Sequence, residues 1–127
     1  MPDTHQDRKP SVDPEMIASL RELQEEGQPD FLGDLIAAYL GEAPARLSAI
    51  ENGIASADMI KVMRACHLMK GSSLNLGATR FAGMLKDLEI KAATDQFTVM
   101  AGAWAKALEE FAMVERELKN LVGTPPA

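Results

Sequence analysis

Residues 66–78, with the sequence CHLMKGSSLNLGA, place three unusual side chains close together: His67, Lys70 and Gly71. An imidazole can act as a nucleophile and carry a covalent intermediate. A cation three residues further along a helix lies on the same face and can offset added negative charge. Glycine weakens a helix interior by about 0.5–1 kcal/mol relative to alanine, but it also removes the side chain that would crowd the ring. The spacing therefore predicts a reactive histidine that a bulky partner can reach.

The element that must position this histidine is a predicted helix over residues 58–76, capped by Asp58 and stopped by Gly77. On a wheel of about 100° per residue, the side chains opposite His67 are small or apolar and are expected to pack inside. That set is Val62, Ala65, Cys66, Met69, Ser72, Ser73 and Leu76. We therefore expect an exposed His67 and a Cys66 that is a core residue.

The outward face around His67 is less polar than a solvated helix face usually is. Within roughly 60° of His67 on the wheel lie Ile60, Met63, Arg64, Lys70, Gly71 and Leu74. No acid occurs from Met59 to Lys86, so this is the positive segment of an acidic chain. Apolar residues rimmed by charge on a soluble protein usually mark a partner site. We predict that Ile60, Met63, Arg64 and Leu74 bind a partner.

Four further stretches have helical spacing of apolar residues and predict an all-α fold. The first begins at Asp13–Pro14 and ends at Gly27; the second opens with Pro29 in its first turn and continues through Pro44. The other two span about 78–93 and 95–121. Long helices with short connections pack antiparallel, so we expect an up-and-down antiparallel four-helix bundle with an additional short N-terminal helix.

Domain boundaries follow from the ends of this periodicity. We expect a flexible N-terminal tail over residues 1–11, one helical bundle over 12–122 and a C-terminal tail over 123–127. A length of 127 residues suits one domain. The sole apolar patch found on the wheel is assigned to a partner, so we expect a monomer.

Composition excludes several classes of function. A net charge of −6 argues against nucleic-acid binding, and no apolar run is long enough to cross a membrane. The N-terminus lacks the apolar core of a signal peptide, and one cysteine cannot form an internal disulfide, which fits a cytoplasmic protein. His5 is the only other histidine and lies in the predicted tail, so the two cannot form a cluster. We therefore expect no metal site and no hydrolytic or metal enzyme.

The stretch from His67 to Ala78 resembles the signature of histidine-containing phosphotransfer (HPt) domains, His-x-x-Lys-Gly-Ser-Ser followed by Leu-Gly-Ala. The segments VD, QPDFLGDLIAAYL, APARL and DLE are also similar to the family, so about 110 residues are covered. Met69 stands where the family usually has leucine, a nearly isosteric change.

The resemblance implies that His67 accepts a phosphoryl group from an aspartyl phosphate of a response-regulator receiver domain and passes it to another receiver. Lys70 would steady the phosphoryl oxygens, Gly71 would give the receiver clearance, and Ser72 and Ser73 would allow close helix packing. The protein would be a phosphocarrier rather than an enzyme and would need no cofactor of its own, because the receiver supplies Mg²⁺. A hybrid sensor histidine kinase is a further partner that the family allows.

An alternative remains open from the residues alone. A helical adaptor that docks a partner through the Ile60, Met63 and Leu74 face, independently of phosphorylation, would show the same apolar patch. In that case His67 would be incidental, and binding would be indifferent to His67→Gln.

Overall fold

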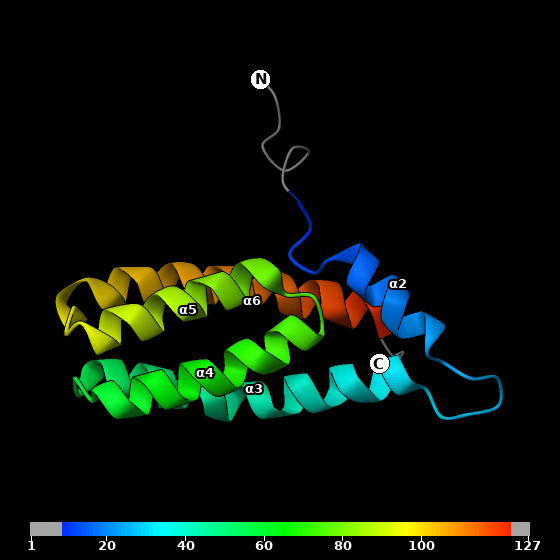
Figure 1. Ribbon diagram of the computed structural model, residues 1–127, viewed down its shortest axis with the longest axis horizontal. Coiled ribbons are helices and arrows are strands. Elements are labelled where there is room, and N and C mark those ends of the chain that lie inside the picture. Colours follow the sequence, from blue (N-terminus) through cyan, green and yellow to red (C-terminus); the bar gives the residue numbers. More distant parts are fainter. Residues whose placement is uncertain (1–8, 123–127) are drawn as a thin grey trace, which may run out of the picture.

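The computed structural model describes residues 9–122 and contains five α-helices and one 3₁₀ turn there. The helices are α2 (Pro14–Glu22), α3 (Phe31–Ala55), α4 (Met59–Asn75), α5 (Thr79–Ala93) and α6 (Met100–Val122), with the 3₁₀ turn η1 (Phe97–Val99) before α6. Helices α3 to α6 run alternately up and down, and α2 lies across one end (Figure 1). This confirms the predicted all-α four-helix bundle with an additional short N-terminal helix.

The helix starts follow the predicted capping chemistry. Asp13 accepts a hydrogen bond from the backbone N of Glu15 at 2.9 Å, and Asp58 accepts one from Lys61 N at 3.1 Å. Each aspartate thereby satisfies a backbone donor that a helix start leaves without a partner. Pro44 lies inside α3, which continues past it to Ala55, as the unbroken apolar register predicted.

Three element boundaries differ from the sequence expectations. Helix α2 ends at Glu22 rather than Gly27, and Leu23, the residue that follows it, is 64% exposed. The Gln24 side chain organises the following loop, since its amide donates to the Pro29 carbonyl and its oxygen accepts from Phe31 N. Helix α3 begins after this loop, at Phe31, and therefore excludes Pro29.

The third difference concerns the last helix, which was predicted to run unbroken from about residue 95. Asp95 instead adopts a left-handed backbone conformation with φ of 57°, and the turn η1 precedes the α-helix. A residue in that conformation cannot continue a right-handed helix, so the chain turns before α6 starts at Met100.

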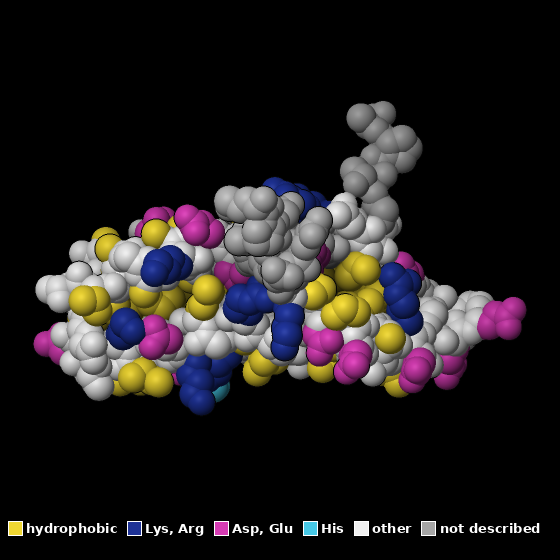
Figure 2. Space-filling view, turned by 90° about the horizontal axis from the view of Figure 1, so that it is seen from above, with side chains coloured by type: hydrophobic (Ala, Val, Ile, Leu, Met, Phe, Trp, Pro, Cys, Tyr) yellow, Lys and Arg dark blue, Asp and Glu magenta, His cyan; other side chains and the backbone are white. Residues whose placement is uncertain are grey.

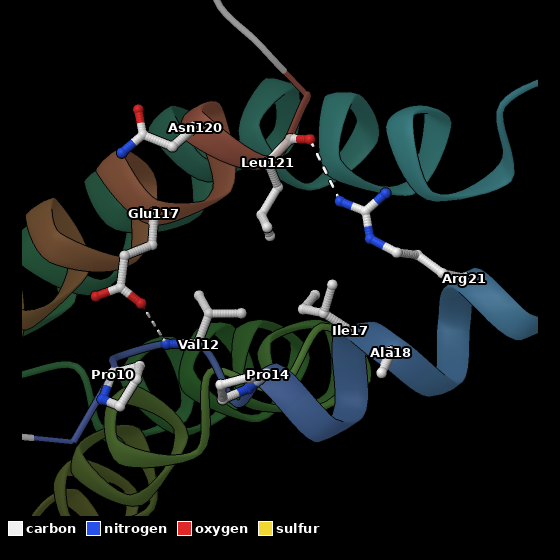
Figure 3. A pocket seen from close by; sticks show the side chains of 9 residues that line it. All are labelled: Pro10, Val12, Pro14, Ile17, Ala18, Arg21, Glu117, Asn120 and Leu121. Atoms are coloured by element: carbon white, nitrogen blue, oxygen red, sulfur yellow. Dashed lines mark hydrogen bonds between the residues drawn. The ribbon is translucent and has the colours of Figure 1, made fainter.

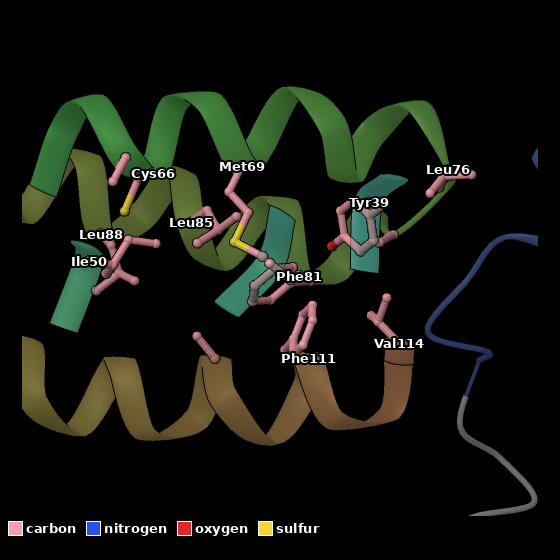
Figure 4. Close-up of a cluster of buried hydrophobic side chains, with 14 of the residues drawn as sticks. Tyr39, Ile50, Cys66, Met69, Leu76, Phe81, Leu85, Leu88, Phe111 and Val114 are labelled. Atoms are coloured by element: carbon pink, nitrogen blue, oxygen red, sulfur yellow. The ribbon is translucent and has the colours of Figure 1, made fainter. Parts of the chain in front are cut away.

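The core fills the space between the four long helices (Figure 4). Phe111 of α6 lies at its centre, with its ring centroid 5.3 Å from that of Phe81 and 6.2 Å from that of Tyr39. The largest fully buried side chains include Ile36, Ile50, Met69, Leu85, Leu88 and Met100. Burial of such side chains contributes about 1.5–3 kcal/mol each, and Met69 is the member of this set that anchors α4.

Residues 9–13 form an N-terminal strap that is bound to the bundle. The Glu117 carboxylate of α6 accepts hydrogen bonds from the backbone N of Ser11 at 3.0 Å and of Val12 at 2.8 Å. Arg80 donates to the Lys9 carbonyl at 2.8 Å, and Asp13 N donates to the Gly77 carbonyl at 2.9 Å.

The predicted boundary between a tail over residues 1–11 and the bundle stays a prediction, although the Lys9 carbonyl and Ser11 N have hydrogen-bond partners in the bundle. Residues 1–8 and the predicted tail over 123–127 lie outside the described residues. Among residues 9–122, each helix is too short or too polar to cross a membrane.

Candidate functional site

His67 lies in the middle of α4, on the face turned away from the core. Its side chain is 71% exposed, whereas its neighbour Cys66 is fully buried. The helical wheel therefore placed both residues correctly. The exposed ring is accessible to a large partner without any rearrangement of the bundle.

Glu89 of α5 brings a carboxylate to this face. Its Oε1 lies 2.8 Å from Lys70 Nζ, forming an ion pair in which the Lys70 and Glu89 side chains are 21% and 18% exposed. Its Oε2 lies 3.9 Å from His67 Nδ1. A partly buried pair is screened less by solvent than a fully exposed one, so we expect it to hold Lys70 beside the imidazole.

The site thus differs from the acid-free face expected from residues 59–86. That expectation covered residues 59–86 alone, whereas Glu89 lies beyond that segment, and the antiparallel neighbour α5 brings it across the helix interface. One carboxylate does not make a metal site, and within residues 9–122 no group of three or more His, Cys, Asp or Glu side chains is arranged to hold a metal ion.

Gly71 is exposed on α4, and a Cβ atom built there would meet no atom of the chain within 4 Å. By contrast, a Cβ at Gly53 would lie 2.7 Å from Cγ2 of Val62, where α3 and α4 pack closely. Packing within the chain thus requires a glycine at position 53 but not at position 71. The open space above Gly71 fits the predicted clearance for a partner.

A shallow hollow surrounds His67 and is lined by Ile60, Met63, Arg64, His67, Leu68 and Glu89. The structure therefore brings three of the predicted partner-binding residues together with the histidine. Leu74 does not line this hollow, although it is 44% exposed further along α4.

Leu68 and Glu89 are the two lining residues that the sequence prediction missed. Leu68 lies about 100° from His67 on the wheel, outside the window that was searched, yet its side chain is 53% exposed. A wider window would have included Leu68. For Glu89 the only sequence signal was its place in the DLE segment, because its approach depends on the register of α5 against α4.

The buried side of α4 holds the site helix in position. Ser73 and Tyr39 share a buried hydrogen bond of 2.8 Å between their hydroxyl groups. Burial raises the pKa of the Cys66 thiol to about 12, and the nearby Glu89 carboxylate adds to this rise. Cys66 is thus a protonated core residue at neutral pH and unsuited to redox chemistry.

Charge and apolar surface are unevenly distributed over the remaining described residues. Acidic side chains gather toward the end formed by α2 and the loop before α3 (Figure 2). A second hollow, lined mainly by apolar side chains, lies at this end between α2, the N-terminal strap and α6 (Figure 3). The prediction of a monomer assumed that the chain has one apolar patch, and this hollow is a second one. The monomer therefore stays a prediction without that support.

Comparisons with known proteins bear on the family and the fold. The family model described as Hpt domain matches residues 34–122. The structure resembles the crystal structure of histidine-containing phosphotransfer protein B from Pseudomonas aeruginosa PAO1 with a TM-score of 0.79. The two chains are 26% identical over 89% of this chain and 95% of the other. The comparison with curated protein sequences gives no match.

Proposed function

The chain belongs to the Hpt domain family, whose role is phosphotransfer in two-component signalling, and on this premise we propose that His67 is the phosphoacceptor of a phosphorelay. The phosphoryl group would arrive from the aspartyl phosphate of one receiver domain and leave to another. The observation that carries the proposal is an exposed histidine with a Lys–Glu ion pair beside it and open space above Gly71.

The arrangement favours Nε2 of His67 as the attacking atom. Glu89 lies on the Nδ1 side, and a carboxylate there stabilises a proton on Nδ1 and leaves the lone pair on Nε2. As the bond between phosphorus and Nε2 forms, the bond between phosphorus and the aspartyl oxygen breaks. The aspartate leaves as a carboxylate, and the Nδ1 proton remains on the ring.

Lys70 would stabilise the phosphoryl oxygens after they arrive. Its ammonium is held by Glu89 beside the ring, so it would need only a short movement to share its charge between the two anions. Mg²⁺ and the acidic pocket that holds it would belong to the receiver. We therefore propose that the protein is a carrier that acts in the cytoplasm and needs no cofactor of its own.

The test of the phosphoacceptor uses a receiver domain charged with labelled phosphate, mixed with the wild-type chain or with His67→Gln. We expect acid-labile, base-stable label on the wild type alone, because phosphohistidine requires the imidazole. Equal melting temperatures of the two proteins would exclude misfolding as the cause. Label on His67→Gln would contradict the proposal, and receiver binding without any transfer would favour the adaptor alternative.

Lys70 is tested separately with Lys70→Ala and the conservative Lys70→Arg. Removal of one charge-stabilising donor lowers such rates by roughly 10²-fold or more, and arginine should restore part of the loss. Rates are read from single-turnover transfer with the receiver in excess. Unchanged transfer in Lys70→Ala would remove Lys70 from the mechanism while leaving His67 as the acceptor.

A further inference from the structure

The Glu89 carboxylate of α5 lies between the two charged or ionisable groups of α4 that form the site. Its Oε1 lies 2.8 Å from Lys70 Nζ, and its Oε2 lies 3.9 Å from His67 Nδ1. The second distance is too long for a hydrogen bond to a neutral ring, but the attraction between opposite charges still acts over it. Glu89 therefore stabilises a positively charged imidazole much more than a neutral one.

The other charges near the ring are cations. Arg64 lines the same hollow from α4, and Lys70 is paired with Glu89. Among the described residues that line this hollow, Glu89 is the only acid, and α3 contributes none of them. The Glu89 side chain is also only 18% exposed, so solvent screens its charge less than that of a surface carboxylate. Glu89 is thus the group of the hollow that can hold a proton on Nδ1.

The Nδ1 proton controls how easily a phosphorylated imidazole loses its phosphoryl group. With the group on Nε2 and a proton on Nδ1, the ring is positively charged. When water attacks, a bond forms between its oxygen and phosphorus, and the bond between phosphorus and Nε2 breaks with its electron pair returning to Nε2. Nδ1 keeps its proton, so neutral imidazole leaves, and both protons of the water go to the phosphate. Without the Nδ1 proton, the ring must leave as an imidazolate anion, which is a far poorer leaving group.

We propose that Glu89 limits the lifetime of the phosphoryl group on His67 by holding the phosphorylated ring in its Nδ1-protonated form at neutral pH. This inference rests on the proposed phosphotransfer at His67 and concerns how long the phosphorylated state persists. Transfer to an aspartate needs the same neutral leaving group, so Glu89 speeds both delivery to a receiver and loss to water. A phosphoryl group that no receiver takes up is released rather than stored.

The ion pair with Lys70 acts in the same direction. While its ammonium is paired with Glu89, it is only partly available to the phosphoryl oxygens. Glutamine at position 89 keeps the size of the side chain but removes its charge, and Lys70 is then free to pair with the phosphoryl group. A cation without its own partner also disfavours a proton on the nearby ring. Both consequences of Glu89→Gln lengthen the lifetime of phosphohistidine.

The experiment uses phosphoramidate, a small phosphoryl donor that reacts with exposed histidines and needs no receiver. Every variant carries His5→Gln, so that His67 is the only histidine. Glu89→Gln is compared with the parent chain and with Glu109→Gln, which removes the same charge from an exposed position of α6 outside the hollow. After the donor is removed, ³¹P NMR follows the remaining phosphohistidine from about pH 6 to about pH 9.

We expect phosphohistidine to last about tenfold longer in Glu89→Gln at about pH 8, because loss of a nearby opposite charge shifts a protonation equilibrium by about one pH unit or more. The pH below which hydrolysis accelerates should fall by a similar amount. Glu109→Gln should match the parent chain in both respects. The profile separates the proposal from a structural effect, since a change of packing alone would not move its position along the pH axis.

A second comparison isolates the proton from the released lysine. Lys70→Ala with Glu89→Gln should still hold phosphate longer than Lys70→Ala alone, because the carboxylate acts on the ring directly. Equal lifetimes in these two variants, or an unshifted pH profile in Glu89→Gln, would overturn the inference. Receivers that phosphorylate His67 in that case would leave the phosphoacceptor proposal intact.

The opposite failure is also recognisable. If phosphohistidine made with phosphoramidate showed the expected dependence on Glu89 but no receiver labelled His67, the phosphoacceptor proposal would fail and the action of Glu89 on the ring would stand. Absence of label on His67 from both kinds of donor would overturn both.

Discussion

The two faces of α4 use the same stretch of sequence in opposite ways. On the inner face, Val62, Cys66 and Met69 are fully buried and contact the other helices of the bundle. On the outer face, His67 and Leu68 are largely exposed and border a hollow. Residues adjacent in the chain thus face different environments because each step along a helix turns by about 100°.

This contrast leads us to expect that stability and the proposed phosphotransfer are separable within a single helix. Substitutions on the inner face should change the free energy of unfolding and leave a folded protein with a normal site. Substitutions on the outer face should change phosphoryl transfer and have little effect on the free energy of unfolding. Four predictions test that separation, in order of decreasing expected effect on the free energy of unfolding, with the pH dependence ranked by its change per pH unit.

The adjacent pair Leu68 and Met69 gives the largest difference. Met69→Ala removes a fully buried side chain and should lower the free energy of unfolding by about 2–5 kcal/mol. Leu68→Ala, at a position that is more than half exposed, should change it by no more than about 0.5 kcal/mol. Urea unfolding of both variants measures these changes in the free energy of unfolding. Similar losses in the two variants would contradict the distinction between the faces.

Ser73→Ala should have the next largest effect. It removes the partner of the Tyr39 hydroxyl, and a buried polar group without its partner costs about 1–3 kcal/mol. Adding Tyr39→Phe should recover part of this loss, because the stranded hydroxyl is then removed as well. A double variant whose loss equals the sum of both single losses would show that the hydrogen bond contributes little.

Alkaline pH should gradually lower the free energy of unfolding, because it ionises groups that are buried at the inner face of α4. Burial raises the pKa of the Cys66 thiol from 9.0 to about 12, so as pH increases the unfolded chain loses this proton first. The free energy of unfolding should therefore be unaffected by Cys66 below pH 9.0 and should fall between 9.0 and about 12, by at most about 1.4 kcal/mol per pH unit. Tyr39, whose pKa burial raises from 10.0 to about 12, should add to the fall above pH 10.0.

Cys66→Ala isolates the thiol in this experiment. The variant should be less stable at neutral pH because it loses packing, yet its stability should fall less between pH 9.0 and 10.0, before Tyr39 contributes. Urea unfolding across this range supplies the comparison. Parallel pH curves for the variant and the wild type would contradict a role for Cys66 ionisation.

Gly71→Ala should have the smallest effect on stability and the opposite sign. Because a Cβ at this position meets nothing within the chain, alanine should raise the free energy of unfolding by about 0.5–1 kcal/mol through helix propensity. The same variant should slow phosphoryl transfer by narrowing the space above His67. Gly53→Ala is the matched control, and we expect it to lose stability because of Val62. Faster or unchanged transfer in Gly71→Ala would contradict the proposal that Gly71 gives the receiver space above His67.

Much of this arrangement could be predicted from the sequence because it follows from helical periodicity. The stripe of apolar residues in α4 gave the orientation of His67 without any knowledge of its neighbours. Aspartates 13 and 58 marked two helix starts, since their side chains cap the backbone locally. Such features depend only on residues within one or two turns of each other.

Features that depend on contacts distant in sequence could not be obtained in this way. Glu89 reaches Lys70 only because α5 packs against α4 in one register, and Glu117 reaches Ser11 across more than a hundred residues. The end of α2 at Glu22 likewise reflects the Gln24 side chain, whose bonds to the following loop compete with further helical turns. A polar side chain in a single sequence does not reveal such a partner.

The N-terminal strap has a consequence for the order in which the chain assembles. The ribosome makes Ser11 and Val12 more than a hundred residues before it makes Glu117, whose carboxylate accepts hydrogen bonds from their N–H groups. The α4–α5 hairpin can pair as soon as it emerges, because its contacts are local in sequence. The strap is therefore translated before the bundle but docks among the last segments, and until then its apolar Val12 is left to solvent or to a chaperone.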